Sequence, residues 1–389
     1  MPRVSANAAP RSRALELSFA GSWLLSLVLS ARLALWPIAI ACVIVGAVGA
    51  FAIVRRSDAG RRSGPWLALA VLNLVALVPE LALRNADFRY VSGIEFGYPT
   101  PTEFVEFAPD RDLFWKLPTG DPLANSFGFF GPEPRTPKPA NTWRWLVLGD
   151  SCSQQGYPSA WPEFATRALP TSADARAIDE INFALSGYSS HQGRVLAQRY
   201  GAVLAPDLVA VYFGWNDHWL AWGAVDADKH IDERFERIYR ASRLLQALRK
   251  LADGTRGAKA KPLDATRVPI ESYRANLSAI CAGFRVCGAR VVLLTAPSAI
   301  DLTGVADYLL TRPFARDAES VTRLHREYNV VVREVAASER ALLLDVEREF
   351  ERRADRAQLF TRDGIHLSDD GKLALAQLFA AFVREQPAK

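Results

Sequence analysis

Leu146-Val147-Leu148-Gly149-Asp150-Ser151 is the stretch that decides the fold of this chain. It completes a run of bulky apolar and aromatic residues at 143–148, which Arg144 alone interrupts. Such a run is typical of a strand that is covered on both faces, and Gly149 then permits a sharp exit. We therefore predict that Ser151 lies at the carboxyl end of a parallel strand, where open α/β sheets bind their ligands.

The rest of the carboxyl-terminal part alternates between the two kinds of secondary structure. Helices are predicted at 161–169, 192–200, 270–284 and 318–337, and further strands at 178–185, 208–213, 290–295 and 341–346. Two of these strands run into small or polar residues, Ser186-Gly187-Tyr188-Ser189 and Gly214-Trp215-Asn216-Asp217. This alternation predicts a doubly wound sheet with a site along one edge.

A fourth group of polar residues, Asp363-Gly364-Ile365-His366, precedes an amphipathic helix predicted at 371–384. Ser368 or Asp369 could cap that helix. In such a turn, the aspartate can accept the proton of one imidazole nitrogen while the other nitrogen faces a substrate.

Each group alone has a simpler explanation, because serine and asparagine often cap helices and glycine permits turns. Together, in order and spacing, the four groups resemble the sequence blocks of the SGNH/GDSL hydrolase superfamily over 143–384. The resemblance implies a flavodoxin-like three-layer α/β/α sandwich with a five-stranded parallel sheet.

The resemblance also implies roles for single residues. Ser151 would be the nucleophile, His366 the general base and acid, and Asp363 the residue that orients the imidazole. The backbone N–H groups of Ser151 and Gly187 and the side-chain amide of Asn216 would form the oxyanion hole. This chemistry needs a base because a serine hydroxyl is a poor nucleophile until its proton is removed.

The composition limits the other possibilities. With 389 residues, of which 50% are hydrophobic, the chain is not mainly disordered, and a net charge of +5 does not indicate a nucleic-acid partner. Its four cysteines show no zinc-ligand spacing, and we expect neither a metal nor a cofactor. Cys281 and Cys287 could pair in an exported domain, although separate buried thiols are favoured, and Cys152 is interpreted as a packed neighbour of Ser151.

The first 84 residues are predicted to form a membrane anchor with two or three spans. Apolar segments occur at 17–31, 33–54 and 63–79, and the first two could form a tight hairpin near Arg32. Arginines gather at the amino terminus and at 55–64, which should both stay cytoplasmic. Three spans would then place the remaining chain in the periplasm or outside the cell. A cleaved signal peptide and soluble core helices are the alternatives.

Two further segments are distinguished by composition. Residues 85–141 are predicted to be an extended connector that packs on the catalytic domain, which occupies 142–389. An insertion at 218–269, with a helix predicted at 231–251, is a candidate lid or a solvated loop.

The combination of an anchor, the upstream Asn125-Ser126-Phe127-Gly128 and a terminal hydrolase domain looks like bacterial proteins associated with envelope polysaccharides. We therefore expect a membrane-anchored serine esterase that removes acyl groups, O-acetyl groups above all, from a carbohydrate. An O-acyltransferase, a lipid esterase or thioesterase, and a non-catalytic envelope-assembly protein are alternatives. The sequence leaves the substrate and the oligomeric state open.

Overall fold

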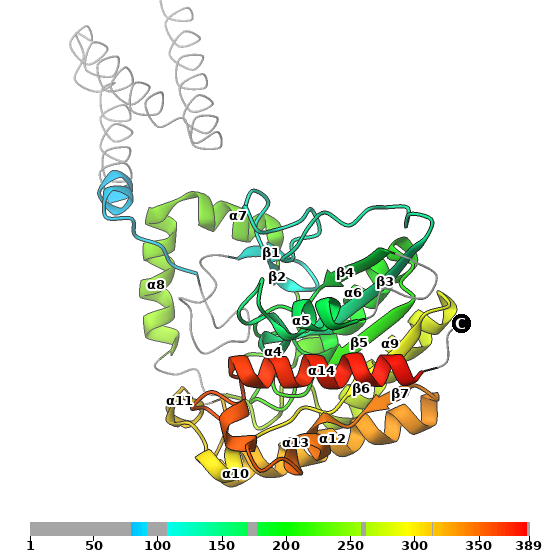
Figure 1. Ribbon diagram of the computed structural model, residues 1–389. Coiled ribbons are helices and arrows are strands. Elements are labelled where there is room, and N and C mark those ends of the chain that lie inside the picture. Colours follow the sequence, from blue (N-terminus) through cyan, green and yellow to red (C-terminus); the bar gives the residue numbers. More distant parts are fainter. Residues whose placement is uncertain (1–78, 92–106, 170–176, 258–261, 313, 387–389) are drawn as a thin grey trace, which may run out of the picture. The chain divides into compact units, whose positions relative to one another are not determined.

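The computed structural model describes residues 79–91, 107–169, 177–257, 262–312 and 314–386 (Figure 1). The chain divides into two compact units. The first unit consists of Met1–Tyr90 and Arg234–Leu251, and the second unit consists of Val91–Glu233 and Ala252–Lys389.

Within its described residues, the second unit is built around a five-stranded parallel sheet. The strands are β3 (Thr142–Gly149), β4 (Ala177–Asn182), β5 (Leu208–Tyr212), β6 (Arg290–Leu294) and β7 (Leu342–Leu344). Their order in the sheet is β4-β3-β5-β6-β7, and Leu146 at the centre pairs with Ile181 on one side and Val209 on the other. This is the strand order of flavodoxin-like sheets. The predicted parallel α/β sheet is therefore confirmed.

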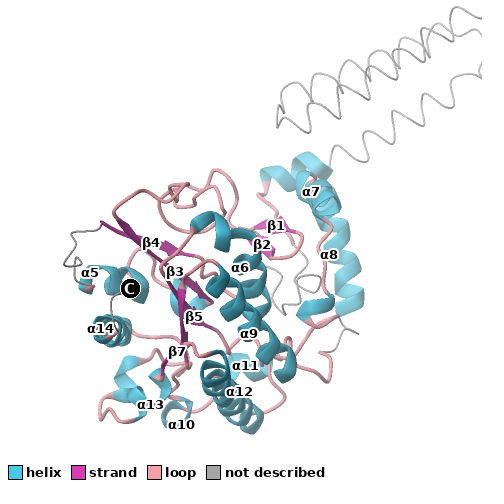
Figure 2. Ribbon diagram, turned by 90° about the vertical axis from the view of Figure 1, so that its right-hand side faces the viewer, coloured by secondary structure: helices cyan, strands magenta, loops and turns pink. Residues whose placement is uncertain are grey.

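Helices cover both faces of this sheet (Figure 2). One face carries α5 (Trp161–Ala168) and α14 (Asp369–Glu385), and the other carries α6 (Ser190–Leu204), α9 (Ile270–Val286) and α12 (Ala318–Glu339). Successive side chains of β3 alternate between the two layers, because Trp145 and Val147 belong to one buried cluster and Leu146 and Leu148 to the other. A strand that is covered twice needs apolar residues at every position, which explains the continuous run.

Shorter helices complete the second unit. They are α4 (Ser151–Gln154), α10 (Ile300–Thr303), α11 (Asp307–Thr311), α13 (Val346–Glu351) and the 3₁₀ turns η2 (Asp226–Asp228) and η3 (Arg356–Leu359).

Part of the predicted connector belongs to the core of the second unit. Strand β1 (Ala108–Asp110) pairs antiparallel with β2 (Phe114–Lys116). Phe114, Trp115 and Phe129 are fully buried in the same cluster as α6 and α9. These aromatic side chains bury enough apolar surface to fix the segment on the domain.

The predicted single helix at 231–251 is wrong, because the chain breaks at Ser242 into α7 (Glu233–Ala241) and α8 (Arg243–Gly257). Ser242 is the N-cap of α8, because its hydroxyl oxygen accepts the backbone N–H of Leu245 at 3.2 Å. The cap is reinforced by Glu80, from the helical segment 79–85. Its carboxylate accepts the Ser242 hydroxyl (2.9 Å) and the backbone N–H groups of Arg243 (3.0 Å) and Leu244 (2.7 Å). These are first-turn donors of α8 that have no acceptor within their own helix.

No helix in the described part of the chain is long and apolar enough to cross a membrane. The apolar segments predicted to span the bilayer lie outside the described residues, apart from Pro79 at the end of the third.

Candidate active site

The turn after β3 places Ser151 at the start of α4. Asp150 precedes the helix, and its carboxylate accepts the backbone N–H of Cys152 at 2.9 Å. Gly149 is required by close packing, since a Cβ there would lie 2.8 Å from the Ser153 hydroxyl oxygen and 3.2 Å from the carbonyl oxygen of Tyr212. The strand can therefore turn sharply and present the Ser151 hydroxyl at the edge of the sheet.

The three predicted catalytic side chains meet at this edge. The Ser151 Oγ lies 2.9 Å from His366 Nε2, although the two residues are 215 positions apart. On the other side of the ring, His366 Nδ1 lies 2.6 Å from Asp363 Oδ2. A proton on Nδ1 is held by the carboxylate, so Nε2 is free to accept the proton of the serine hydroxyl.

The loop that carries His366, here called the histidine loop (361–366), is organised by Asp363. Its Oδ1 accepts the Thr361 hydroxyl (2.7 Å) and the backbone N–H groups of Ile365 (2.9 Å) and His366 (3.0 Å). Burial alone would raise the pKa of Asp363, but the hydrogen bond and charge of His366, together with these N–H groups, lower it overall. Asp363 is thus an anionic orienter for the imidazole.

Gly364 permits the shape of the histidine loop. Its φ is +68°, and a Cβ there would come within 2.5 Å of the Thr303 hydroxyl oxygen. Both the backbone conformation and the available space therefore exclude a side chain at this position.

The residues predicted for the oxyanion hole follow β4 and β5. Gly187, with φ +82°, lies in the loop 186–189, here called the oxyanion loop. The Ser186 hydroxyl donates to the Gln154 side chain of α4 at 2.6 Å, which holds this loop beside the turn that carries Ser151. Asn216 is buried, and its Nδ2 donates to Asp150 Oδ2 at 3.2 Å. The second hydrogen of that amide remains available to an oxyanion.

Asp150 orients Asn216 from a buried position. Burial raises the pKa of Asp150 to about 6, against the lowering effects of the Cys152 N–H, the charge of His366 and the Asn216 amide. The aspartate of the Gly-Asp-Ser sequence thus supports the turn that carries Ser151 and the Asn216 amide.

Residues 147–374 match the GDSL-like Lipase/Acylhydrolase family, and this match spans more than half of the chain. The chain belongs to this family. It is accordingly a GDSL-type hydrolase that acts on carboxylic ester bonds. No curated protein sequence matches the chain.

Solved structures of similar proteins were also found. The lipase/acylhydrolase from Enterococcus faecalis is 17% identical, with 64% of this chain and 100% of that chain covered and a TM-score of 0.41. An alpha/beta hydrolase from the metagenome of Lake Arreo, Spain, is 20% identical, with coverages of 63% and 97% and a TM-score of 0.40. An acetylxylan esterase from Geobacillus stearothermophilus is 18% identical, with coverages of 63% and 95% and a TM-score of 0.39.

Two residues that support the oxyanion loop in this GDSL-family enzyme, Arg267 and Asp226, were not predicted from the sequence. The Arg267 Nη1 donates to the carbonyl oxygen of Gly187 at 2.8 Å, and its Nη2 donates to Asp226 at 2.8 Å. Asp226 also accepts the Ser189 hydroxyl at 2.8 Å. Arg267 and Asp226 are buried and lie in the insertion at 218–269, where no motif distinguishes them from other charged residues.

Three other residues near the motifs are packed in the interior. His191 is stacked on Phe114, with ring centroids 5.6 Å apart, and His218 is buried beside Trp219. Burial, together with the charges of Asp150 and Asp363, raises the pKa of the Cys152 thiol well above its usual value. Cys152 therefore stays protonated and does not compete with Ser151.

Neither a disulfide nor a metal centre was found among the described residues. Cys281 and Cys287 are separate thiols. Within the same part of the chain, no group of three or more His, Cys, Asp or Glu side chains could hold a metal ion.

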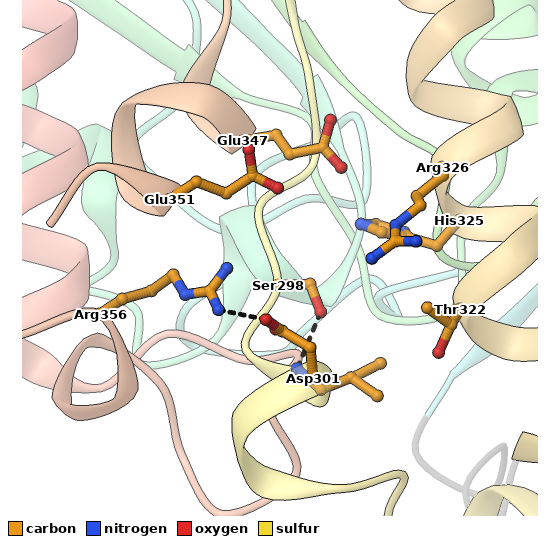
Figure 3. A pocket seen from close by; sticks show the side chains of 9 residues that line it. Ser298, Asp301, Thr322, His325, Arg326, Glu347, Glu351 and Arg356 are labelled. Atoms are coloured by element: carbon orange, nitrogen blue, oxygen red, sulfur yellow. Dashed lines mark hydrogen bonds and ion pairs between the residues drawn. The ribbon is translucent and has the colours of Figure 1, made fainter. Parts of the chain in front are cut away.

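A pocket of about 40 Å³ is lined by residues of α10, α12 and α13 (Figure 3). Its wall includes Ser298, whose hydroxyl donates to the carbonyl oxygen of Gly364 at 3.4 Å, and Arg356, which is ion-paired with Asp301. The volume suits one or two water molecules and not a sugar.

Proposed function

We propose that this enzyme removes acyl groups, in particular O-acetyl groups, from a carbohydrate or envelope polysaccharide. The observation that carries the chemical part is the chain of contacts from Ser151 through His366 to Asp363, with distances of 2.9 Å and 2.6 Å. The substrate class is supported by the sequence, in which apolar segments predicted to form a membrane anchor precede the hydrolase domain.

The geometry supports a two-step acyl transfer. His366 Nε2 takes the proton of Ser151 as the oxygen attacks the ester carbonyl, and the same nitrogen then protonates the departing sugar oxygen, which leaves as a hydroxyl. Asp363 stays ionised and stabilises the imidazolium. Water, deprotonated in turn by His366, attacks the acyl-enzyme and regenerates the serine. A sugar hydroxyl in place of water would make the enzyme an O-acyltransferase.

The exposure of the site supports a bulky substrate. The side chains of His366 and Asp363 are 22% and 17% exposed, so the reacting groups lie close to the surface. An acetyl group on a polymer can reach such a position without the chain entering a tunnel.

The test is acetate release by the full-length protein in detergent, with p-nitrophenyl acetate and acetylated polysaccharides as substrates and Ser151→Ala as the control. We expect release from both substrates by the wild type alone. A preference for long acyl chains would favour a lipid esterase or thioesterase, and product formation only with a sugar acceptor would favour the transferase. Absence of all these activities in a folded protein would favour the envelope-assembly alternative.

We also propose that residues 1–84 hold the enzyme in the cytoplasmic membrane, with the second unit in the periplasm or outside the cell. The apolar segments and flanking arginines support this proposal, and so does the polarity of the α7–α8 hairpin. Its interior contains Glu236 and Arg249 as an ion pair at 2.7 Å. Large apolar side chains are exposed instead: Phe235 57%, Ile238 59%, Leu248 52% and Leu251 70%.

The place of the hairpin in the chain supports a contact with the membrane. Glu80, which caps α8, comes directly after the third predicted span at 63–79. The start of α8 would therefore lie at the membrane surface, where an apolar face with nearby cations such as Arg237 and Lys250 suits anionic lipid.

The membrane proposal can be tested with a nitroxide label at Leu251→Cys in nanodiscs that contain anionic lipid. Leu251 should show the high oxygen and low nickel accessibility of a lipid-facing site, whereas Val286→Cys, at a position 90% exposed on α9, should resemble a site in water. Equal accessibility at both positions would contradict the lipid contact. Protease added to spheroplasts should digest the second unit, and its protection would contradict the proposed orientation.

A further inference from the structure

Trp115, in strand β2, is fully buried against the oxyanion loop. Its indole Nε1 donates to the carbonyl oxygen of Ser186 at 3.1 Å. Tyr188, which follows Gly187, holds the tryptophan in return, because its hydroxyl donates to the carbonyl oxygen of Trp115 at 2.6 Å. The centroids of the Trp115 and Tyr188 rings lie 5.7 Å apart. The tryptophan and the loop are thus joined by two hydrogen bonds and by ring packing.

The carbonyl that Trp115 binds belongs to the same peptide unit as the Gly187 N–H. This peptide is not among the cis bonds of the described chain, so its C=O and N–H point in opposite directions. Fixing the oxygen on the side of Trp115 therefore fixes the direction of the Gly187 N–H. Within the described residues, that N–H donates to no backbone carbonyl outside the regular helices and strands.

This constraint matters because the loop has little rigidity of its own. Gly187 has φ +82° and no side chain, so the flanking peptides could rotate at low cost if nothing held them. Arg267 holds the following carbonyl, that of Gly187 itself, at 2.8 Å. Hydrogen bonding to the Ser186 carbonyl also polarises the peptide and strengthens its N–H as a donor, by roughly 10–30% in condensed-phase estimates.

We propose that Trp115 is a positioning residue for the oxyanion hole, which holds the Ser186–Gly187 peptide so that its N–H faces the carbonyl oxygen of the ester. This inference rests on the proposed mechanism, in which the Gly187 N–H stabilises the tetrahedral oxyanion. It makes the segment before residue 142 part of the catalytic apparatus and not a spacer alone.

Trp115→Phe tests the proposal, because it removes the indole N–H and keeps an aromatic ring in the core. The oxyanion exists only near the transition state, so loss of its alignment should lower kcat and leave KM nearly unchanged. We expect kcat for p-nitrophenyl acetate to fall about 10-fold, less than the roughly 10²–10³-fold loss on removing an oxyanion donor entirely. KM should stay within about two-fold of the wild type.

Trp145→Phe is the matched control. Trp145 is also fully buried, and its Nε1 donates to the Thr166 hydroxyl at 3.1 Å, but it lies in the cluster on the other face of the sheet. The Trp145→Phe variant should lose about as much thermal stability as Trp115→Phe and should retain the wild-type kcat. The proposal is overturned if folded Trp115→Phe keeps its kcat, if only KM rises, or if Trp145→Phe loses as much kcat. Should Trp115→Phe not fold, Tyr188→Phe removes only the hydroxyl that holds Trp115, and kcat should again fall while KM does not change.

A second readout separates this proposal from the proposed function. A fluorophosphonate forms a tetrahedral adduct on the nucleophilic serine whatever the natural substrate is. Its rate of labelling of the full-length protein should fall about as much as kcat in Trp115→Phe. If the wild type hydrolyses no ester but is labelled, the proposed substrate fails while Trp115 is still tested. An unchanged labelling rate in the folded variant contradicts the role of Trp115.

Discussion

The histidine loop and the oxyanion loop flank the same serine but are held in place differently. In the histidine loop, the donors to Asp363 come from Thr361, Ile365 and His366, at most three positions away. In the oxyanion loop, the supporting contacts come from Gln154, Trp115, Arg267 and Asp226, which are between 32 and 80 positions away in sequence. The carboxylate that orients His366 thus has local donors, although the Gly364 carbonyl of the same loop also accepts the Ala299 N–H at 2.9 Å. The carbonyls of the oxyanion loop are held mainly from distant segments, although Ser189 also donates to Gln192 at 2.8 Å.

This difference explains why one half of the site can be recognised in a sequence. A loop with local support keeps its reactive and supporting residues in one short motif, such as Asp363-Gly364-Ile365-His366. A loop with distant support shows only a small residue at its tip. Mutations in the histidine loop should therefore remove groups that take part in the reaction. Mutations around the oxyanion loop should instead lower activity by displacing the Gly187 N–H.

The largest loss of kcat is expected for Ser151→Ala, the variant with which mutations in both loops are compared. Removing the nucleophile should lower kcat by at least about 10⁴-fold, because neither loop can replace the acyl-enzyme step. Burst kinetics with p-nitrophenyl acetate and mass spectrometry of the acylated protein check this. An acyl adduct of unchanged yield in the variant would show that another residue is the nucleophile.

Asp363→Asn should have the next largest effect, a loss in kcat of about 10²- to 10⁴-fold with the fold intact. The amide cannot stabilise the imidazolium and favours the wrong tautomer of His366. The control is Asp369→Asn, whose side chain is 93% exposed at the start of α14. Hydrolysis rates of the two variants, compared at matched folded fractions, check the assignment. Equal activity of Asp363→Asn and the wild type would remove Asp363 from the mechanism.

The site and the fold were predictable from sequence to different degrees, for physical reasons. Strands covered on both faces leave continuous apolar runs, so β3 and β5 were found at nearly their observed positions. The break at Ser242 was missed although serine is a common N-cap, and Ser242 does accept the Leu245 N–H at 3.2 Å. Only the contribution of Glu80, which is 162 positions away, was not predictable. The roles of Trp115 and Arg267 were likewise missed, since a buried tryptophan and a charged residue in an insertion are common without any catalytic role.

A moderate loss of kcat is expected for Arg267→Met. This variant tests whether Arg267 acts by positioning the oxyanion loop or by stabilising the fold. The variant leaves buried Asp226 with Lys229 as its remaining cationic partner, at 3.3 Å, and should cost about 3–5 kcal/mol of unfolding free energy. It should also lower kcat by about 10-fold, because the Gly187 carbonyl loses its donor.

The triple variant Arg267→Met, Asp226→Leu, Lys229→Met makes this prediction sharper. Removing all three charges should recover much of the stability, because buried Lys229 is then not left without its partner Asp226. The carbonyl of Gly187 still lacks its donor, so kcat should stay low. Chemical unfolding and steady-state kinetics of the same samples test this, and a recovery of kcat together with stability would show that Arg267 acts through stability alone.

The smallest expected effect is on stability as the pH changes, through two aspartates whose pKa values move in opposite directions: buried Asp217 and half-buried Asp363. Burial raises the pKa of Asp217, beside the oxyanion loop, to about 7, despite the hydroxyl and N–H of Ser190. The folded state then binds more protons than the unfolded state between about pH 4 and 7, so Asp217 lowers the unfolding free energy as pH rises through this window. For Asp363, whose pKa is lowered, the stabilising contribution is present above about pH 4 and is lost as pH falls.

Urea unfolding in two pH windows should therefore separate the two aspartates. Asp217→Asn should gain stability relative to the wild type between about pH 4.5 and 8, by about 2 kcal/mol, roughly half of what a full shift of three pKa units allows, because water can reach an ionised carboxylate. Asp363→Asn should differ from the wild type by a nearly constant amount in that window, and should lose stability relative to the wild type as pH rises from about 2.5 to 4.5. A gain of stability by Asp363→Asn over the lower window would contradict the stabilisation of its carboxylate by local donors.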